Sequence, residues 1–421
     1  MEKALLVTVK LKDEKLKDEK DDFRIEDMAE ELEQLVRSSG GEVVKNIYCK
    51  LDKPTPNLYI GKGKAEELSY ICQENDIDTV IFSCDISGTQ QRNLEEIIGR
   101  KTIDRTQLIL DIFAQHAFSP EGKAQVELAQ LEYLLPRLIG KGIMLSRLGG
   151  GIGTRGPGEK KLEVDRRKIK RRISKLRQYL KEVRKHRNIT RTERKKQQIP
   201  TVALVGYTNA GKSTLLNALT DAHQLVNNTL FTTLDPLSKA LKLNNGQRIV
   251  LTDTVGFLHN LPHNLIEAFK ATLEEIQEAD LIIHVLDICS PLVYSHYKVV
   301  MEVLKGLGLE NKPLITALNK IDLLTDKQIL EKYQRDFLNA IPISAKLKQN
   351  LELLLKEIET YFRPNLVYVK MKLPLNRMDL VNLFYEQGKV EKISFTDKEI
   401  KIEANLPSSL VDKLLKFKEI K

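Results

Sequence analysis

The 421-residue sequence lacks any long uninterrupted apolar run. A helix that crosses a membrane needs about 18 or more consecutive apolar residues, so no membrane span is predicted. The first residues, Met1–Val7, lead straight into a strand-like stretch, without the apolar core and cleavage site of a signal peptide. We therefore expect a cytoplasmic protein, with peripheral association with a membrane as the alternative location.

Cysteine is also scarce, with only Cys49, Cys72, Cys84 and Cys289 in the chain. No two of these residues form a CxxC pair or show the spacing of zinc ligands. Scattered thiols are typical of proteins from a reducing compartment. We expect the four cysteines to fill core positions rather than to bind a metal.

Positive charge is concentrated in one part of the chain. Residues 158–198 contain 18 Lys and Arg against 5 Asp and Glu, whereas the rest of the chain has 49 basic and 53 acidic residues. A solvated charged helix would explain the polarity of this block but not its excess of positive charge. A block of this size indicates a polyanionic partner, and we favour nucleic acid.

The order of apolar runs predicts four domains in a mixed α/β chain. Residues 1–118 alternate strand-like and helix-like segments, which predicts a small α/β unit. Residues 119–198 repeat leucine and isoleucine at heptad spacing in two arms, which predicts a coiled-coil helical hairpin. Residues 199–363 alternate again and predict a doubly wound sheet, and residues 364–421 predict a small α+β domain.

Residues 140–158 join the two arms of the predicted hairpin and include 8 glycines among 19 residues. A segment this rich in glycine cannot bury a core. A flexible tether is one interpretation, but a tether needs no arginine, and this segment contains Arg147 and Arg155. We favour a basic finger that adapts to phosphates and bases.

The clearest motif is GxxxxGKS, which lies between an apolar strand and a helix-like run. Its two glycines allow backbone N–H groups to face a phosphate chain at the positive end of the helix. The Lys212 ammonium would reach the β- and γ-phosphates, and the Ser213 hydroxyl would bind magnesium. The candidate phosphate-binding residues are Gly206, Tyr207, Thr208, Asn209, Ala210, Gly211, Lys212, Ser213 and Thr214.

Three later stretches occur where a guanine nucleotide site needs them. Asp253 would hold magnesium through water, and the Gly256 N–H would meet the γ-phosphate. The Asp322 carboxylate would accept hydrogen bonds from N1 and N2 of guanine, a donor pair that adenine lacks. Asn319 would tie this loop to the phosphate loop. The candidate residues are Asp253, Thr254, Val255, Gly256, Asn319, Lys320, Asp322, Ser344, Ala345 and Lys346, and their order and spacing predict binding of GTP and GDP with Mg²⁺.

The expected reaction is GTP hydrolysis. Thr233 stands where a threonine closes on magnesium in the GTP state, with Thr232 as the alternative, so Ser213, Thr233 and Asp253 are the predicted metal ligands. The candidate catalytic residues are Lys212, Thr233, Gly256 and Phe257.

Phe257 occupies the position where a glutamine would orient the attacking water, so we expect an intrinsic rate as slow as about 10⁻⁴ per second and stimulation by a partner. Asn209 offers an oxygen near the β–γ bridge of the nucleotide. Two interpretations stay open for this residue: it holds a potassium ion that supplies positive charge, or it stabilises the loop.

The motifs GYTNAGKSTLLNAL, FTTLDP, DTVGFLHNLPH and NKID resemble those of the HflX family of translation-related GTPases. The likeness extends to EGKAQVELAQLEYLLPRL and RLGGGIGTRGPGEKKLEVDRR, and it covers about residues 40–345. It implies a GTPase that binds the large ribosomal subunit and its RNA through the hairpin and glycine-rich loop, and that splits stalled or stressed ribosomes. GTP would favour this binding, and the ribosome would stimulate hydrolysis.

Two other functions are compatible with the sequence. A GTPase that assembles the large subunit would share the basic hairpin and slow hydrolysis, and a nucleotide-gated RNA-binding adaptor would not depend on hydrolysis. In each case we expect a monomer.

Overall fold

The computed structural model describes residues 1–12, 24–138, 157–196, 199–220, 230–231, 235–259, 273–363, 366–396, 398–407, 410–411 and 414. The chain divides into two compact units. The first contains Met1–Val183, Asn227–Asp235 and Leu258–Ala271, and the second contains Arg184–Val226, Pro236–Phe257 and Thr272–Lys421. The predicted division into four domains stays a prediction.

The first unit begins with a parallel sheet in the order β2-β1-β3-β4. Its strands are β1 (Lys3–Leu11), β2 (Glu42–Leu51), β3 (Thr79–Phe82) and β4 (Lys101–Asp104), and its helices are α1 (Ile25–Ser38), α2 (Lys62–Glu74), α3 (Gly88–Ile98) and α4 (Arg105–His116). Apolar residues of α2 and α3 pack on one face of this sheet. The α/β prediction is confirmed, although β4 was not expected, because four residues that begin with an exposed lysine carry little strand signal.

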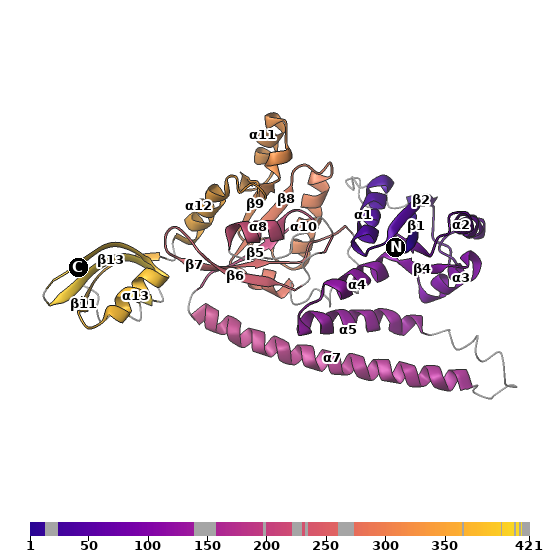
Figure 1. Cartoon of the computed structure of the whole chain (residues 1–421), viewed down its shortest axis with the longest axis horizontal. Coiled ribbons are helices and arrows are strands. Elements are labelled where there is room, and N and C mark those ends of the chain that lie inside the picture. The colour runs from indigo at the N-terminus through magenta and orange to yellow at the C-terminus, as the bar shows by residue number, and fades with distance from the viewer. Residues whose placement is uncertain are drawn as a thin grey trace. The chain divides into compact units, whose positions relative to one another are not determined.

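The predicted hairpin consists of α5 (Pro120–Arg137) and α7 (Pro157–Lys196), which lie side by side in Figure 1. Their contact is apolar and includes residues predicted from the heptad spacing: Leu128, Leu131, Leu135, Ile169, Ile173, Leu176 and Leu180. Arg172 forms a two-bonded ion pair with Glu127, with both distances 2.6 Å, and Arg177 pairs with Glu132 at 2.8 Å. Residues 139–156, which contain most of the predicted basic finger, lie outside the described part of the chain.

The second unit contains a six-stranded sheet in the order β10-β9-β8-β5-β7-β6, in which β6 pairs antiparallel and the other strands pair parallel. Its strands are β5 (Thr201–Val205), β6 (Leu237–Lys242), β7 (Arg248–Asp253), β8 (Leu281–Asp287), β9 (Leu314–Asn319) and β10 (Ala340–Pro342). Helices α8 (Lys212–Leu219) and α12 (Leu351–Phe362) cover one face, and α10 (Val293–Gly306) covers the other. This sheet confirms the predicted GTPase-type fold.

The parallel strands place the functional segments at one edge of the sheet. The GxxxxGKS loop follows β5, and residues 344–346 follow β10. The DTVG segment begins at the last residue of β7, and the NKID segment begins at the last residue of β9. The carboxyl ends of parallel strands meet at the same edge, where doubly wound sheets bind their ligands. The topology therefore brings together motifs that are more than 100 residues apart.

Residues 366–407 include a three-stranded antiparallel sheet of β11 (Leu366–Pro374), β13 (Glu399–Pro407) and β12 (Lys389–Phe395), with α13 (Met378–Gln387) packed on one face. This matches the predicted α+β fold of the tail. Of the helices that the structure describes, none has the length and apolar character to span a bilayer.

Candidate nucleotide site

The phosphate loop leaves β5 at Gly206 and enters α8 at Lys212. A Cβ atom at Gly206 would lie 2.3 Å from the carbonyl oxygen of Val285 in β8. Gly211 has a φ of +96°, and a Cβ atom there would lie 2.3 Å from Nδ2 of Asn319. Both glycines of the motif are therefore required by the packing of this loop, and at Gly211 by the backbone conformation as well.

The Lys212 side chain is buried beneath this loop. Its Nζ donates hydrogen bonds to the carbonyl oxygens of Gly206, at 3.2 Å, and Tyr207, at 2.8 Å. Burial lowers the pKa of Lys212 to about 8, while the charge of Asp253 acts in the opposite direction. The negative charge of a nucleotide's phosphates would favour the protonated amine, as the predicted role requires.

Gly256 closely approaches the phosphate loop. A Cβ atom at this position would lie 2.7 Å from Cα of Thr208 and 3.0 Å from Nζ of Lys212. The loop is also joined to this segment by two backbone hydrogen bonds, from Thr208 N–H to Phe257 O at 2.9 Å and from Phe257 N–H to Gly206 O at 3.1 Å. The structure thus brings the DTVG segment and the phosphate loop together, as the sequence predicted.

Ser213 and Asp253 provide oxygen atoms suited to Mg²⁺. The Ser213 hydroxyl donates to Oδ2 of Asp253 at 2.7 Å, and both residues are buried. Hydroxyl and carboxylate oxygens are the ligands that Mg²⁺ prefers, and this ion usually takes its remaining ligands from phosphates and water. The donor set therefore fits the ion. Thr233, the third predicted ligand, and the alternative Thr232 lie outside the described residues.

The predicted base-binding segments are held together by Asn319. Its Nδ2 donates to the carbonyl oxygen of Ala210 at 2.8 Å, and its Oδ1 accepts the Ala345 N–H at 3.0 Å. The Ser344 hydroxyl donates to Oδ1 of Asp322 at 2.6 Å and so orients the carboxylate predicted to read guanine. One side chain thus joins the phosphate loop, the NKID segment and residues 344–346, although Lys346 itself is exposed.

Asp287 was not among the site residues predicted from the sequence. This residue ends β8, and its carboxylate pairs with Nζ of Lys320 at 2.6 Å. The ion pair holds the side chain of Lys320, whose backbone φ is +72°. The neighbouring Cys289 is exposed, so the expectation that every cysteine fills the core is wrong at this position. The position of Asp287 at the end of an apolar strand could have indicated that it lies near the site, because the carboxyl ends of parallel strands commonly form the ligand-binding edge of the sheet.

The Phe257 ring lies in the core rather than at the surface of the site. The side chain is 4% exposed and packs with Val205, Ile276 and Ile282. Its predicted part in hydrolysis stays a prediction. Asn209, which is exposed with a φ of +59°, is placed in the phosphate loop as expected, and its proposed link to potassium stays a prediction as well.

His284 is a second residue that sequence reasoning missed, although a histidine stands out within the apolar strand β8. It is fully buried, and neither ring nitrogen has a hydrogen-bond partner within the described residues. Burial and, to a smaller extent, the positive charge of Lys212 lower the pKa of His284 to about 3. The neutral ring is therefore part of the core behind the phosphate loop.

We expect His284 to make the protein less stable in mild acid. Because its folded pKa lies below the unfolded value of about 6.5, the unfolded state binds more protons below that pH, and the free energy of unfolding falls by about 1.4 kcal/mol between pH 7.5 and 5.5. The variant His284→Phe should lose this share of the pH dependence. Urea unfolding of both proteins at the two pH values measures the free energy of unfolding. An equal decrease of this free energy in wild type and in His284→Phe would contradict the burial of a neutral histidine.

Comparisons with known proteins place these features in a family. Family models match the chain at residues 26–114 (GTP-binding GTPase N-terminal), 116–194 (GTP-binding GTPase middle region) and 201–320 (50S ribosome-binding GTPase). A protein named GTPase HflX from Caldanaerobacter subterraneus subsp. tengcongensis is 49% identical over 93% of this chain and 90% of its own length. A protein of the same name from Lacrimispora saccharolytica is 45% identical over 90% of this chain and 90% of its own length. Another, from Escherichia coli, is 39% identical over 88% of this chain and 87% of its own length.

Proposed function

The chain belongs to the GTPase HflX family and hydrolyses GTP, and we propose that it binds the large ribosomal subunit and splits stalled or stressed ribosomes. The observation that carries this proposal is the set of exposed basic side chains on α7. The matched model for residues 201–320 is that of a 50S ribosome-binding GTPase, which supports the choice of partner.

The hairpin presents positive charge on a long helix. One side of α7 is occupied by the apolar contact with α5, and Arg172 and Arg177 are paired with acidic residues of that helix. Other basic side chains of α7 are exposed: Arg166, Lys170, Arg171 and Lys175. Lys and Arg on a preformed helix can bind RNA phosphates without a large ordering cost, and this binding positions a protein on RNA without reading its sequence.

The nucleotide site would control this binding. In the proposed mechanism Lys212 binds the β- and γ-phosphates, the Gly256 N–H meets the γ-phosphate, and Asp322 selects guanine. Ser213, Asp253 and Thr233 would hold Mg²⁺, which neutralises developing charge on the phosphates when bound. A potassium ion at Asn209 would add positive charge. Ordering of Thr233 in the GTP state would favour the ribosome-binding conformation, and hydrolysis would allow release.

Ribosome-stimulated hydrolysis tests the proposal. We expect a rate of about 10⁻⁴ per second for the protein alone and an increase of at least about a hundredfold with purified large subunits. The measurement is phosphate release from GTP with and without large subunits, in potassium and in sodium salts. No stimulation in potassium would contradict the proposed partner, whereas equal rates in the two salts would contradict only the role of Asn209.

A further inference from the structure

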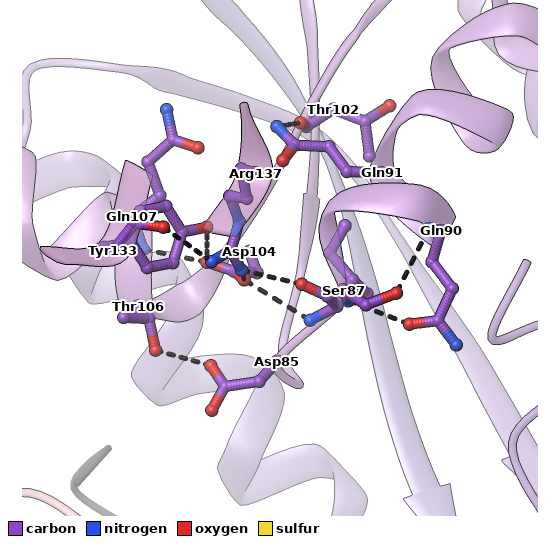
Figure 2. Close-up of polar contacts among 11 residues, drawn as sticks. Asp85, Ser87, Gln90, Gln91, Thr102, Asp104, Thr106, Gln107, Tyr133 and Arg137 are labelled. Carbon is purple, nitrogen blue, oxygen red and sulfur yellow. Dashed lines mark hydrogen bonds and ion pairs between the residues drawn. The ribbon is translucent and has the colours of Figure 1, made fainter. Parts of the chain in front are cut away.

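Asp104 holds the end of α5 on the α/β sheet of the first unit (Figure 2). The side chain lies at the end of β4 and is fully buried. Its carboxylate caps α4 by accepting the Gln107 N–H at 2.8 Å, and it accepts the Ile86 N–H at 3.3 Å. From α5 it accepts the Tyr133 hydroxyl at 2.7 Å and the Arg137 guanidinium at 2.9 Å. One buried carboxylate therefore joins β4, α4, the loop after β3 and the last two turns of α5.

Arg137 strengthens this connection with contacts of its own. Its Nη2 also donates to the carbonyl oxygen of Ile86 at 2.7 Å, and its guanidinium lies over the Tyr133 ring, 3.4 Å from the ring centre. The Arg137 side chain is only 15% exposed, so it forms a largely buried ion pair with Asp104. Removing one partner of such a pair is costly, because the other charge is left buried and uncompensated.

The backbones of α3 and α5 approach closely at Gly88, the first residue of α3. A Cβ atom at this position would lie 2.9 Å from Cα of Arg137 and 3.0 Å from its Cγ. Because the nearest atom belongs to the backbone, alanine at position 88 would push the two helices apart. This contact does not depend on the polar contacts of Asp104, and it provides a second way to disturb the end of α5.

The last turn of α5 needs such support because it contains Pro136. Proline has no N–H, so one helical hydrogen bond is missing there, and proline inside a helix is destabilising. Arg137 partly compensates, because its Nη1 donates to the carbonyl oxygen of Tyr133 at 3.1 Å. The end of α5 therefore depends on side-chain contacts as well as on its own backbone.

The opposite face of α5 carries α7. Leu128, Leu131 and Leu135 pack against apolar residues of α7. Tyr133 and Arg137 lie on the other face and contact Asp104, as the helical period of 3.6 residues requires. Helix α5 thus connects the exposed basic face of α7 to the α/β sheet, and all of these contacts lie within the first unit.

We propose that Asp104 is a positioning residue that locks the hairpin and the α/β sheet into one rigid body, and that this rigidity is needed to split ribosomes rather than to bind them. A protein that binds one subunit can displace the other only if the part that binds and the part that pushes move together. If the joint at Asp104 yields, the basic face of α7 keeps its contacts with RNA while the α/β sheet no longer follows it. This inference rests on the proposed function.

Hydrogen exchange of the full chain, without ribosomes, tests the joint. In Asp104→Asn and in Gly88→Ala we expect the backbone amides among residues 133–138 to exchange at least about tenfold faster than in wild type, because the contacts that hold this turn are lost. Exchange in β1 should stay that of wild type, since the variants disturb the joint and not the sheet. Unchanged exchange at residues 133–138 in Gly88→Ala and in folded Asp104→Asn would overturn the positioning role.

Each variant has a matched control in the same unit. Asp27→Asn changes another buried carboxylate, which accepts the Arg24 N–H at 2.8 Å at the start of α1. Gly63→Ala adds a Cβ atom in α2, which would meet no described atom within 4 Å. Both controls should exchange like wild type at residues 133–138.

The rate of ribosome splitting at increasing protein concentration, with GTP, tests the consequence for function. Asp104→Asn and Gly88→Ala should show a maximal rate reduced about tenfold, with a half-saturating concentration within about twofold of wild type. Partial unfolding would have the opposite effect, because fewer active molecules raise the half-saturating concentration and leave the maximal rate unchanged. That pattern, or a maximal rate equal to that of the controls, would overturn the inference alone. No splitting by wild type would instead remove the proposed function, and the inference with it.

Discussion

Replacing Asp322 with asparagine is expected to change the base preference of the protein from guanine to xanthine. In the proposed site the carboxylate would accept hydrogen bonds from N1–H and the 2-amino group of guanine, whereas an amide offers one acceptor and one donor. Xanthine carries an oxygen at position 2, which can accept from that amide. A buried polar group left without a partner is costly, so GTP affinity should fall about a thousandfold or more, and affinity for xanthosine triphosphate should rise.

Competition binding with the two nucleotides measures this effect. Asp326→Asn is the matched control, because Asp326 follows the same loop but caps α11 (Lys327–Asp336) through the Gln328 N–H, at 2.8 Å. Its base preference should stay that of wild type. GTP affinity that is unchanged in Asp322→Asn would show that another group reads the base.

Neutralising the exposed basic face of α7 should remove most of the affinity for large ribosomal subunits. With about 6–10 phosphate contacts, wild-type affinity is expected to fall about a thousandfold or more from 50 to 200 mM salt. The triple variant Lys170→Ala, Arg171→Ala, Lys175→Ala should bind more weakly at every salt concentration, and the slope of log affinity against log salt should decrease by about 2–3.

The control for this variant removes the same charge elsewhere. Lys305, Lys327 and Lys356 are exposed on α10, α11 and α12, and their replacement by alanine lowers the net charge equally. Binding of labelled protein to subunits across a salt series measures both variants. Similar losses in the two triple variants would mean that overall charge, rather than the face of α7, determines binding.

Much of the nucleotide site could be predicted because its chemistry is local in sequence. The GxxxxGKS loop, Asp253 and the NKID segment each follow a buried strand, and parallel strands bring such ends to one edge. The hairpin could be predicted for the same reason, since Leu128, Ile173 and their neighbours repeat at a helical period. These features need no knowledge of distant contacts.

The features that were missed depend on long-range contacts. The pairing of Asp287 with Lys320 follows from the packing of β8 against β9. The hydrogen bond from the Ser119 N–H to the Asp235 carboxylate joins residues 116 positions apart. Strand β4 is too short to show a period. His284 is buried, and its ring nitrogens have no hydrogen-bond partner within the part of the chain that the structure describes. This contradicts what its polarity suggests, and only the fold reveals it.

Sedimentation of ribosomes tests the central claim most directly. Intact ribosomes would be incubated with the protein and GTP, or with a non-hydrolysable GTP analogue, at low salt, and resolved on a sucrose gradient. The proposed function predicts that the peak of intact ribosomes decreases and both subunit peaks increase. It also predicts that Lys212→Ala, which lacks the ammonium proposed to bind the phosphates, leaves the ribosomes intact. An unchanged ribosome peak, with the protein bound to free large subunits and hydrolysing GTP there, would contradict splitting and favour a role in subunit assembly.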